Sequence, residues 1–286
     1  MVSKTNLEHL NDIYAFVYLI MTFFKKLEKR VSARQTYLCV GLDPVWGEIP
    51  EHLPHSQEGL LEFLLQIVNE TKDHVAVFKP NFAYFEALGP SGMEVLQELI
   101  QKIPPEIPVI GDAKRGDVGH SSRMYAKAVF ETFGCDAVTV TPYLGHDALE
   151  PFLDNPDRGV FVLCLTSNSG ANDFQLPDLH LKVAKKVREW NIYGNAGLVV
   201  GATRPENIAA IREISGRMPY LIPGIGTQGG DLRNTLFYAD DGSKIPYLIS
   251  TSRSILYASS KEDFAQQAGT TARKLQDQIN LCRSSL

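Results

Sequence analysis

The sequence predicts an α/β protein of the (β/α)8 TIM-barrel class with an additional N-terminal helix. A short β-branched run, a polar or glycine-bearing loop and an amphipathic helix follow one another repeatedly from Thr36 onward. Eight such units in about 250 residues have the size and order of this barrel. An open doubly wound sheet is the main alternative. However, no G-x-G-x-x-G follows the first predicted strand, and strand candidates continue to the C-terminus.

Each predicted element rests on the spacing of its apolar residues. Short apolar runs bounded by turn residues predict strands at 37–42, 75–78, 107–111, 137–141, 160–165, 197–201, 220–223 and 247–250. Apolar residues at helical spacing predict helices at 59–71, 91–103, 121–130, 182–191, 204–214 and 261–281.

The first residues form a predicted extension ahead of one large domain. Residues 13–24 are nearly all apolar, but this run is too short to span a bilayer and lacks the basic start of a signal peptide. Phe23, Phe24, Leu27 and Val31 recur at helical spacing, which predicts a helix packed on the barrel. We therefore expect residues 1–22 to be an extension of uncertain order and residues 23–286 to be a single barrel domain.

Composition narrows the class of function. The 286 residues are 44% hydrophobic and 21% charged, which is enough for a large core. The net charge of -5 argues against a general nucleic-acid binder, so an anionic ligand needs local positive groups. Three of the four widely spaced cysteines lie in apolar runs, which is typical of free thiols in a reducing cytosol.

The densest group of charges is Asp112-Ala-Lys-Arg-Gly-Asp117, directly after the third predicted strand. Asp112 and Lys114 would project to the same side of an extended segment, and Gly116 allows a turn that returns Asp117 toward them. Such a motif alone is more often a solvated loop with a structural ion pair. Polar residues at other strand ends favour a site, because these ends share one mouth of a TIM barrel. They are Asp43, Lys79, Thr141, Thr166, Ser167 and Asn168.

The loops after the seventh and eighth strands predict a phosphate site. Barrels commonly hold phosphate there with backbone amides and a helix N-terminus. Glycines allow such amides to approach an anion, and Arg253 supplies a planar charged fork next to Ser252. A glycine-rich turn beside a surface arginine is the alternative. The glycines are Gly224, Gly226, Gly229 and Gly230.

Several motifs occur together in a fixed order from about Phe23 to the C-terminus. They are Asp43, Lys79, Asp112-x-Lys114-x-x-Asp117, Pro223-Gly-x-Gly-x-Gln228 and Arg253. In this combination the chain resembles the orotidine 5'-phosphate decarboxylase family, which catalyses the last step of de novo UMP synthesis. The motif Asp-Ala-Lys-Arg-Gly-Asp-Val-Gly is similar to that of the longer bacterial branch of the family, the type 2 subfamily.

The resemblance implies decarboxylation of orotidine 5'-phosphate to UMP and carbon dioxide without a metal or cofactor, in a cytoplasmic homodimer. The protein would bind the nucleotide substrate and would bind neither nucleic acid nor a membrane. Lys79, Asp112, Lys114 and Asp117 would form the catalytic array, in which Lys114 protonates the carbanion at C6. Asp117 and the hydroxyl of Ser121 would act across the dimer interface.

The resemblance also implies the remaining substrate contacts. Asp43 and Lys79 would bind ribose hydroxyls, and Thr166, or Ser167 beside it, would meet the pyrimidine edge. The phosphate side would be formed by Pro223, Gly224, Gly226, Gln228, Gly229, Ser252 and Arg253, with Gln228 bridging base and phosphate. Two departures stand out: threonine is usual where Ser121 stands, and His120 is bulkier than the family pattern.

Two alternatives remain open. One is another sugar-phosphate enzyme on the same barrel, such as the metal-dependent ketogulonate-phosphate decarboxylases or hexulose-phosphate synthases. These enzymes share an acid-x-Lys pattern on the third strand but need a magnesium site of further carboxylates, where this chain has Lys79 and Lys114. The other is a catalytically inactive barrel that binds a nucleotide or a partner protein.

Overall fold

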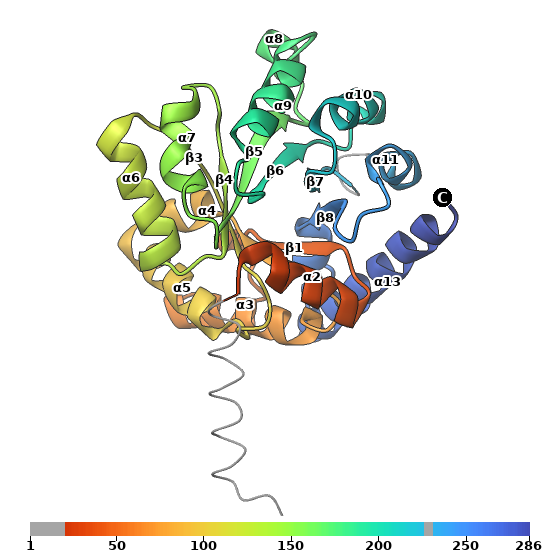
Figure 1. Ribbon diagram of the computed structural model, residues 1–286. Helices are drawn as coiled ribbons and strands as arrows, with labels where there is room; N and C mark the ends of the chain where they lie inside the picture. Colours follow the sequence, from red (N-terminus) through yellow and green to blue (C-terminus); the bar gives the residue numbers. More distant parts are fainter. Residues whose placement is uncertain (1–20, 226–230) are drawn as a thin grey trace, which may run out of the picture.

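The computed structural model describes residues 21–225 and 231–286 (Figure 1). Eight parallel strands form one sheet in the order β2-β1-β8-β7-β6-β5-β4-β3. Isolated bridges Phe78–Val109 and Asn81–Asp112 connect the two outer strands, β2 and β3. The sheet therefore forms a nearly closed barrel with helices around it, and the predicted TIM-barrel class is confirmed.

Each predicted strand overlaps an observed one, because runs of β-branched and aliphatic residues are buried on both faces of a parallel sheet. The largest difference is in the third strand, which was expected to end at Gly111 and instead continues to Arg115. Asp112 and Lys114 thus lie within the strand, not after it. The strands are β1 (Leu38–Leu42), β2 (Val77–Pro80), β3 (Ile110–Arg115), β4 (Ala137–Val140), β5 (Gly159–Leu165), β6 (Ala196–Val200), β7 (Tyr220–Pro223) and β8 (Tyr247–Thr251).

The helices cover the outside of the barrel (Figure 1). Their apolar side chains are buried in the core. In α3, for example, the side chain of Ser56 accepts a hydrogen bond from the amide of Gly59 at the N-cap, and Leu60, Phe63 and Leu64 are buried. The helices are α2 (Phe23–Arg34), α3 (Gln57–Thr71), α4 (Phe82–Glu86), α5 (Gly89–Lys102), α6 (Gly119–Lys127), α7 (His146–Leu153), α8 (Ala171–Phe174), α9 (Leu179–Trp190), α10 (Pro205–Ser215), α11 (Leu232–Ala239), α12 (Arg253–Leu256) and α13 (Phe264–Ser284).

Helix α2 lies across the amino-terminal end of the barrel (Figure 1). Phe23 packs edge-on against Phe161 of β5, with ring centroids 5.9 Å apart. The ammonium of Lys26 lies 2.9 Å from the carboxylate of Asp136, which directly precedes β4. The predicted helix and its packing on the barrel are confirmed. Residues 1–20 of the predicted extension lie outside the described residues, so the division at residue 22 remains a prediction.

Candidate active site

The charged group is built on an irregularity in β3. Gly111 pairs with Val138 of β4 and Arg115 pairs with Val140, so the three residues 112–114 lie opposite the single residue Thr139. Lys114 has a φ of 48°, in the left-handed region that L-residues with a Cβ rarely adopt. This β-bulge, and not the simple alternation of an extended strand, sets how Asp112 and Lys114 face each other.

The carboxylate of Asp112 lies between two ammonium groups. Its Oδ2 is 2.6 Å from Nζ of Lys79, which comes from β2, and its Oδ1 is 2.6 Å from Nζ of Lys114. The hydroxyl of Thr139 also donates a hydrogen bond to Oδ1 at 2.9 Å. The structure therefore brings together Lys79, Asp112 and Lys114, three of the four residues expected in the array, from the ends of two strands.

The three charged groups differ in their exposure to solvent. Lys79 and Asp112 are buried, whereas the side chain of Lys114 is 50% exposed. Burial would raise the pKa of Asp112, but the charges of Lys79 and Lys114 outweigh it and hold this pKa below its ordinary range. Burial would lower the pKa of Lys79, but Asp112 and Asp43 raise it above its ordinary value. The pair therefore stays ionised at neutral pH, and Lys114 can reach a ligand in the mouth.

Asp43 and the end of β8 form an adjoining polar corner. A Cβ on Gly41 would lie 2.8 Å from Cβ of Ser252 and 3.3 Å from Oδ1 of Asp43, so both side chains border the same backbone. Among the described residues, Asp43 Oδ1, Thr251 Oγ1 and Ser252 Oγ are buried without a hydrogen-bond partner. Such groups are costly unless something satisfies them. A ligand hydroxyl would donate to Asp43 Oδ1, and the hydroxyls of Thr251 and Ser252 would donate to oxygen atoms of a ligand such as a phosphate.

Only part of the predicted phosphate loop can be placed. Pro223 ends β7, Gly224 follows with a φ of 103°, and Arg253 is exposed at the start of α12. Within the ranges 21–225 and 231–286, Arg253 forms no salt bridge. Its guanidinium thus has no carboxylate to compete with an anionic ligand. Gly226, Gln228, Gly229 and Gly230 lie outside the described residues.

Asp117 and Ser121 lie apart from the array. Asp117 Oδ1 accepts a hydrogen bond from the amide of Val118 at 2.7 Å, and no described contact joins it to Lys114. The turn at Gly116 therefore does not return Asp117 to Lys114 within one chain, contrary to the expectation from its position. Glycine is needed there for another reason, because a Cβ would lie 2.8 Å from Cγ2 of Thr141. Ser121 is exposed in α6.

The loop after β5 is held by a side chain that was not predicted from the sequence. The amide of Thr166 donates a hydrogen bond to Oε1 of Gln175 at 2.7 Å, and Nε2 of Gln175 donates one to the hydroxyl of Thr166 at 2.9 Å. The hydroxyl of Thr166 in turn donates to Oδ1 of Asn168 at 2.6 Å. Gln175 thereby fixes the loop segment at Thr166, although no sequence signal marks Gln175 itself.

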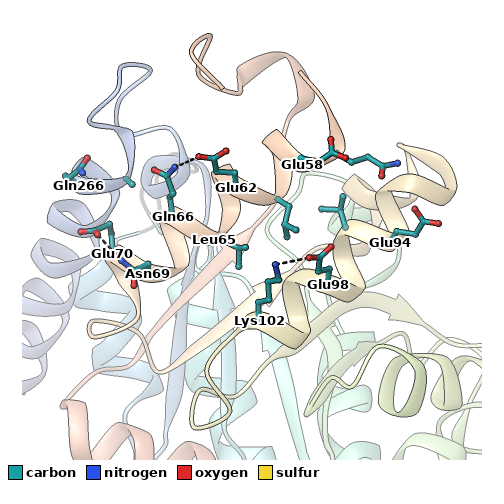
Figure 2. A pocket seen from close by; sticks show the side chains of 14 residues that line it. Glu58, Glu62, Leu65, Gln66, Asn69, Glu70, Glu94, Glu98, Lys102 and Gln266 are labelled. Carbon is teal, nitrogen blue, oxygen red and sulfur yellow. Dashed lines mark hydrogen bonds and ion pairs between the residues drawn. The ribbon is translucent and has the colours of Figure 1, made fainter. Parts of the chain in front are cut away.

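A separate groove of about 830 Å³ lies outside the barrel, between α3, α5 and the start of α13 (Figure 2). Its lining includes one lysine, Lys102, which is 2.8 Å from the carboxylate of Glu98. The carboxylates along the groove would repel a phosphate ester, so this groove does not suit a nucleotide. They belong to Glu58, Glu62, Glu70, Glu94 and Glu98.

The described residues contain neither a cluster of metal ligands nor a helix that could cross a membrane. In residues 21–225 and 231–286, no three His, Cys, Asp or Glu side chains are grouped as metal ligands would be. The described helices include none that is long and apolar enough to span a bilayer.

The fold and the array define a TIM-barrel protein with lysine and aspartate side chains meeting at one mouth. The family described as "Orotidine 5'-phosphate decarboxylase / HUMPS family" matches residues 36–268. This chain belongs to that family.

Curated relatives and solved structures agree with this assignment. The orotidine 5'-phosphate decarboxylase of Roseiflexus castenholzii is 47% identical, over 91% of this chain and 98% of the relative. That of Dehalococcoides mccartyi is 46% identical with the same coverage. The structure of Leishmania donovani OMP decarboxylase covers 93% of this chain and 100% of its own, with a TM-score of 0.81 and 36% identity.

Proposed function

We propose that this protein decarboxylates orotidine 5'-phosphate to UMP and carbon dioxide, the final step of de novo pyrimidine biosynthesis. The observation that carries this proposal is the position of Asp112 between Lys79 and Lys114, with Lys114 exposed toward the mouth. Relatives at 47% and 46% identity are orotidine 5'-phosphate decarboxylases by name, which favours this reaction over that of the hexulose-phosphate branch of the family.

The chemistry explains why a lysine would stand there. When the bond between C6 and the carboxylate breaks, its electron pair stays on C6, in an orbital with no conjugated sink. An ammonium beside C6 can stabilise that charge and donate the proton that forms the new C6–H bond. Lys114 would perform both tasks, and its neutral amine would then regain a proton from solvent. We propose that no metal or cofactor takes part.

Asp112 would act on the substrate's ground state. Its buried carboxylate stays charged and would lie near the substrate carboxylate, since both would approach the Lys114 ammonium. The repulsion between them ends when carbon dioxide leaves, which is ground-state destabilisation. The carboxylate of Asp112 would also hold Lys114 in place, through the contact of 2.6 Å between Oδ1 and Nζ.

Binding of the distant parts of the substrate must contribute as well. Enzymes can lower barriers by up to about 23 kcal/mol, whereas one oriented donor supplies about 3–4 kcal/mol. Contacts of Arg253 and Gln228 with phosphate, of Asp43 and Lys79 with ribose, and of Thr166 or Ser167 with the base would hold C6 against the array. Their binding energy would then offset the repulsion at the reacting end.

We further propose a cytoplasmic homodimer in which Asp117 and Ser121 complete the partner's site. Asp117 is not paired with a cation among the described residues, so a lysine of a second copy would supply its partner. Helix α6, its N-cap residue and the loop after β4 also expose large apolar side chains, a pattern that marks interaction surfaces. They are Val118, Met124, Tyr125, Tyr143 and Leu144.

The test of the proposed reaction is the loss of orotidine 5'-phosphate absorbance after purified protein is added, with a chelator present. Turnover that is unaffected by the chelator supports the proposed reaction. If folded protein leaves orotidine 5'-phosphate intact but converts a sugar phosphate when magnesium is added, the other branch of the family is the correct assignment.

A further inference from the structure

Thr139 is the single residue of β4 that lies opposite the bulge of β3. Its hydroxyl makes two contacts across the strands. It donates a hydrogen bond to Asp112 Oδ1 at 2.9 Å, and it accepts one from the backbone amide of Lys114 at 3.0 Å. One hydroxyl thus contacts the side chain of one array residue and the backbone of another.

A bulge creates a need for such a contact. Three residues of β3 oppose one residue of β4, so the regular ladder cannot supply each backbone amide with a carbonyl. The amide of Lys114 finds its acceptor in the Thr139 hydroxyl instead. Because Lys114 is in the left-handed region, a conformation that costs about 1–2 kcal/mol, an added restraint is needed to hold it there.

The same hydroxyl restricts the carboxylate of Asp112. Oδ1 receives hydrogen bonds from both Lys114 and Thr139, while Oδ2 receives one from Lys79. Thr139 is 2% exposed, so solvent does not compete for these contacts. Its branched Cβ also limits the rotation of the side chain, which keeps the hydroxyl aimed at the bulge.

We propose that Thr139 is a positioning residue that holds Asp112 and the backbone of Lys114 in the arrangement needed for catalysis. The proposal rests on the proposed decarboxylation and adds a residue that acts through the array without touching the substrate. A role in stability alone would leave the turnover of the folded protein unchanged. A positioning role would lower turnover while leaving binding of the ribose and phosphate intact.

The experiment compares Thr139→Val, which keeps the shape and removes the hydroxyl, with Thr139→Ser, which keeps the hydroxyl. Thr71→Val is the matched control, because Thr71 is also buried but its hydroxyl donates to the carbonyl of Ile67 within α3. For each variant, kcat and KM are measured with orotidine 5'-phosphate, the Kd of UMP by calorimetry, and folding by circular dichroism.

We expect Thr139→Val to lower kcat by about 10- to 100-fold, because small misplacements of reacting groups have effects of that size. The Kd of UMP should change by less than about threefold, and Thr139→Ser and Thr71→Val should keep kcat within about threefold of the wild type. If Thr139→Val does not fold, Thr139→Ala makes the same comparison without placing a methyl group beside Asp112.

An unchanged kcat in folded Thr139→Val or Thr139→Ala, with an active wild type, would overturn the positioning role and leave the proposed reaction standing. An equal loss in Thr139→Ser would also contradict it, since the hydroxyl is retained there. A folded wild type without turnover would contradict the proposed reaction itself, and the positioning role with it.

Discussion

The ammonium of Lys79 and the carboxylate of Asp112 lie 2.6 Å apart, with side chains that are 8% and 11% exposed. A buried ion pair of this kind is costly to break, because the remaining charge has neither its partner nor water. The proposed catalytic array and the stability of the barrel therefore depend on the same contact.

The first prediction concerns that contact. Asp112→Asn leaves the Lys79 ammonium buried without a counter-charge, and we expect the free energy of unfolding to fall by about 3–5 kcal/mol. Asp73→Asn is the control, because Asp73 pairs with Arg34 at 2.9 Å on the surface. This substitution should lower the free energy of unfolding by at most about 1 kcal/mol. Urea denaturation measures both. Similar losses in the two variants would contradict the importance of burial.

The second prediction is how the difference in free energy of unfolding between the wild type and Asp112→Asn depends on pH. The pKa of Asp112 is depressed in the folded state, so its contribution is complete above the unfolded value of about 4 and is lost as pH falls below it. The pKa of Lys79 is raised, so its contribution is complete below about 10. The stability gap between wild type and Asp112→Asn should stay constant from about pH 5 to 7 and narrow below about pH 4. Narrowing that begins near pH 6 would refute this assignment of charge.

The third prediction tests the phosphate contact. Arg253→Ala removes a charged hydrogen-bond donor worth about 1.5–3 kcal/mol, so KM for orotidine 5'-phosphate should rise roughly 10- to 150-fold. Arg217→Ala is the control, since Arg217 is exposed in the segment before β7. Steady-state kinetics on folded proteins make the comparison. An unchanged KM in Arg253→Ala would remove this residue from the phosphate site.

The fourth prediction tests the shared site. Lys114→Ala and Asp117→Ala should each be inactive alone, because each lacks one member of every site. In mixed dimers, one site combines intact Lys114 with intact Asp117 of the other subunit, so an equal mixture should recover about a quarter of wild-type activity. Subunits are exchanged by mild denaturation and refolding. Mixed dimers without recovered activity would place Asp117 outside the partner's site.

The sequence predicted the barrel because its buried strands are β-branched runs with clear boundaries. It also identified α2, since Phe23, Leu27 and Val31 recur on one helical face. The inward positions of Lys26 and Arg30 in that helix were not predicted. Their partners, Asp136 and the carbonyl of Val75, come from distant segments, and helical periodicity carries no information about such contacts.

The site was partly predictable for a similar reason. Strand ends and alternation indicated that Asp112 and Lys114 would meet, but neither indicated the bulge or the left-handed Lys114. Thr139 looked like an ordinary strand residue, because threonine is common in strands. The proposed contact of Asp117 with the site of a second copy could not be read from the geometry of one chain.

The most direct test of the account is decarboxylation of orotidine 5'-phosphate by Lys114→Ala, with chelator present. Lys127→Ala is the matched control, because Lys127 is an exposed lysine of α6. We expect Lys114→Ala to lose about 10⁴-fold or more in kcat, since it removes both the proton donor and the charge at C6, while it still binds UMP. Lys127→Ala should match the wild type. A folded Lys114→Ala variant with kcat within about tenfold of the wild type would contradict the central role of this lysine.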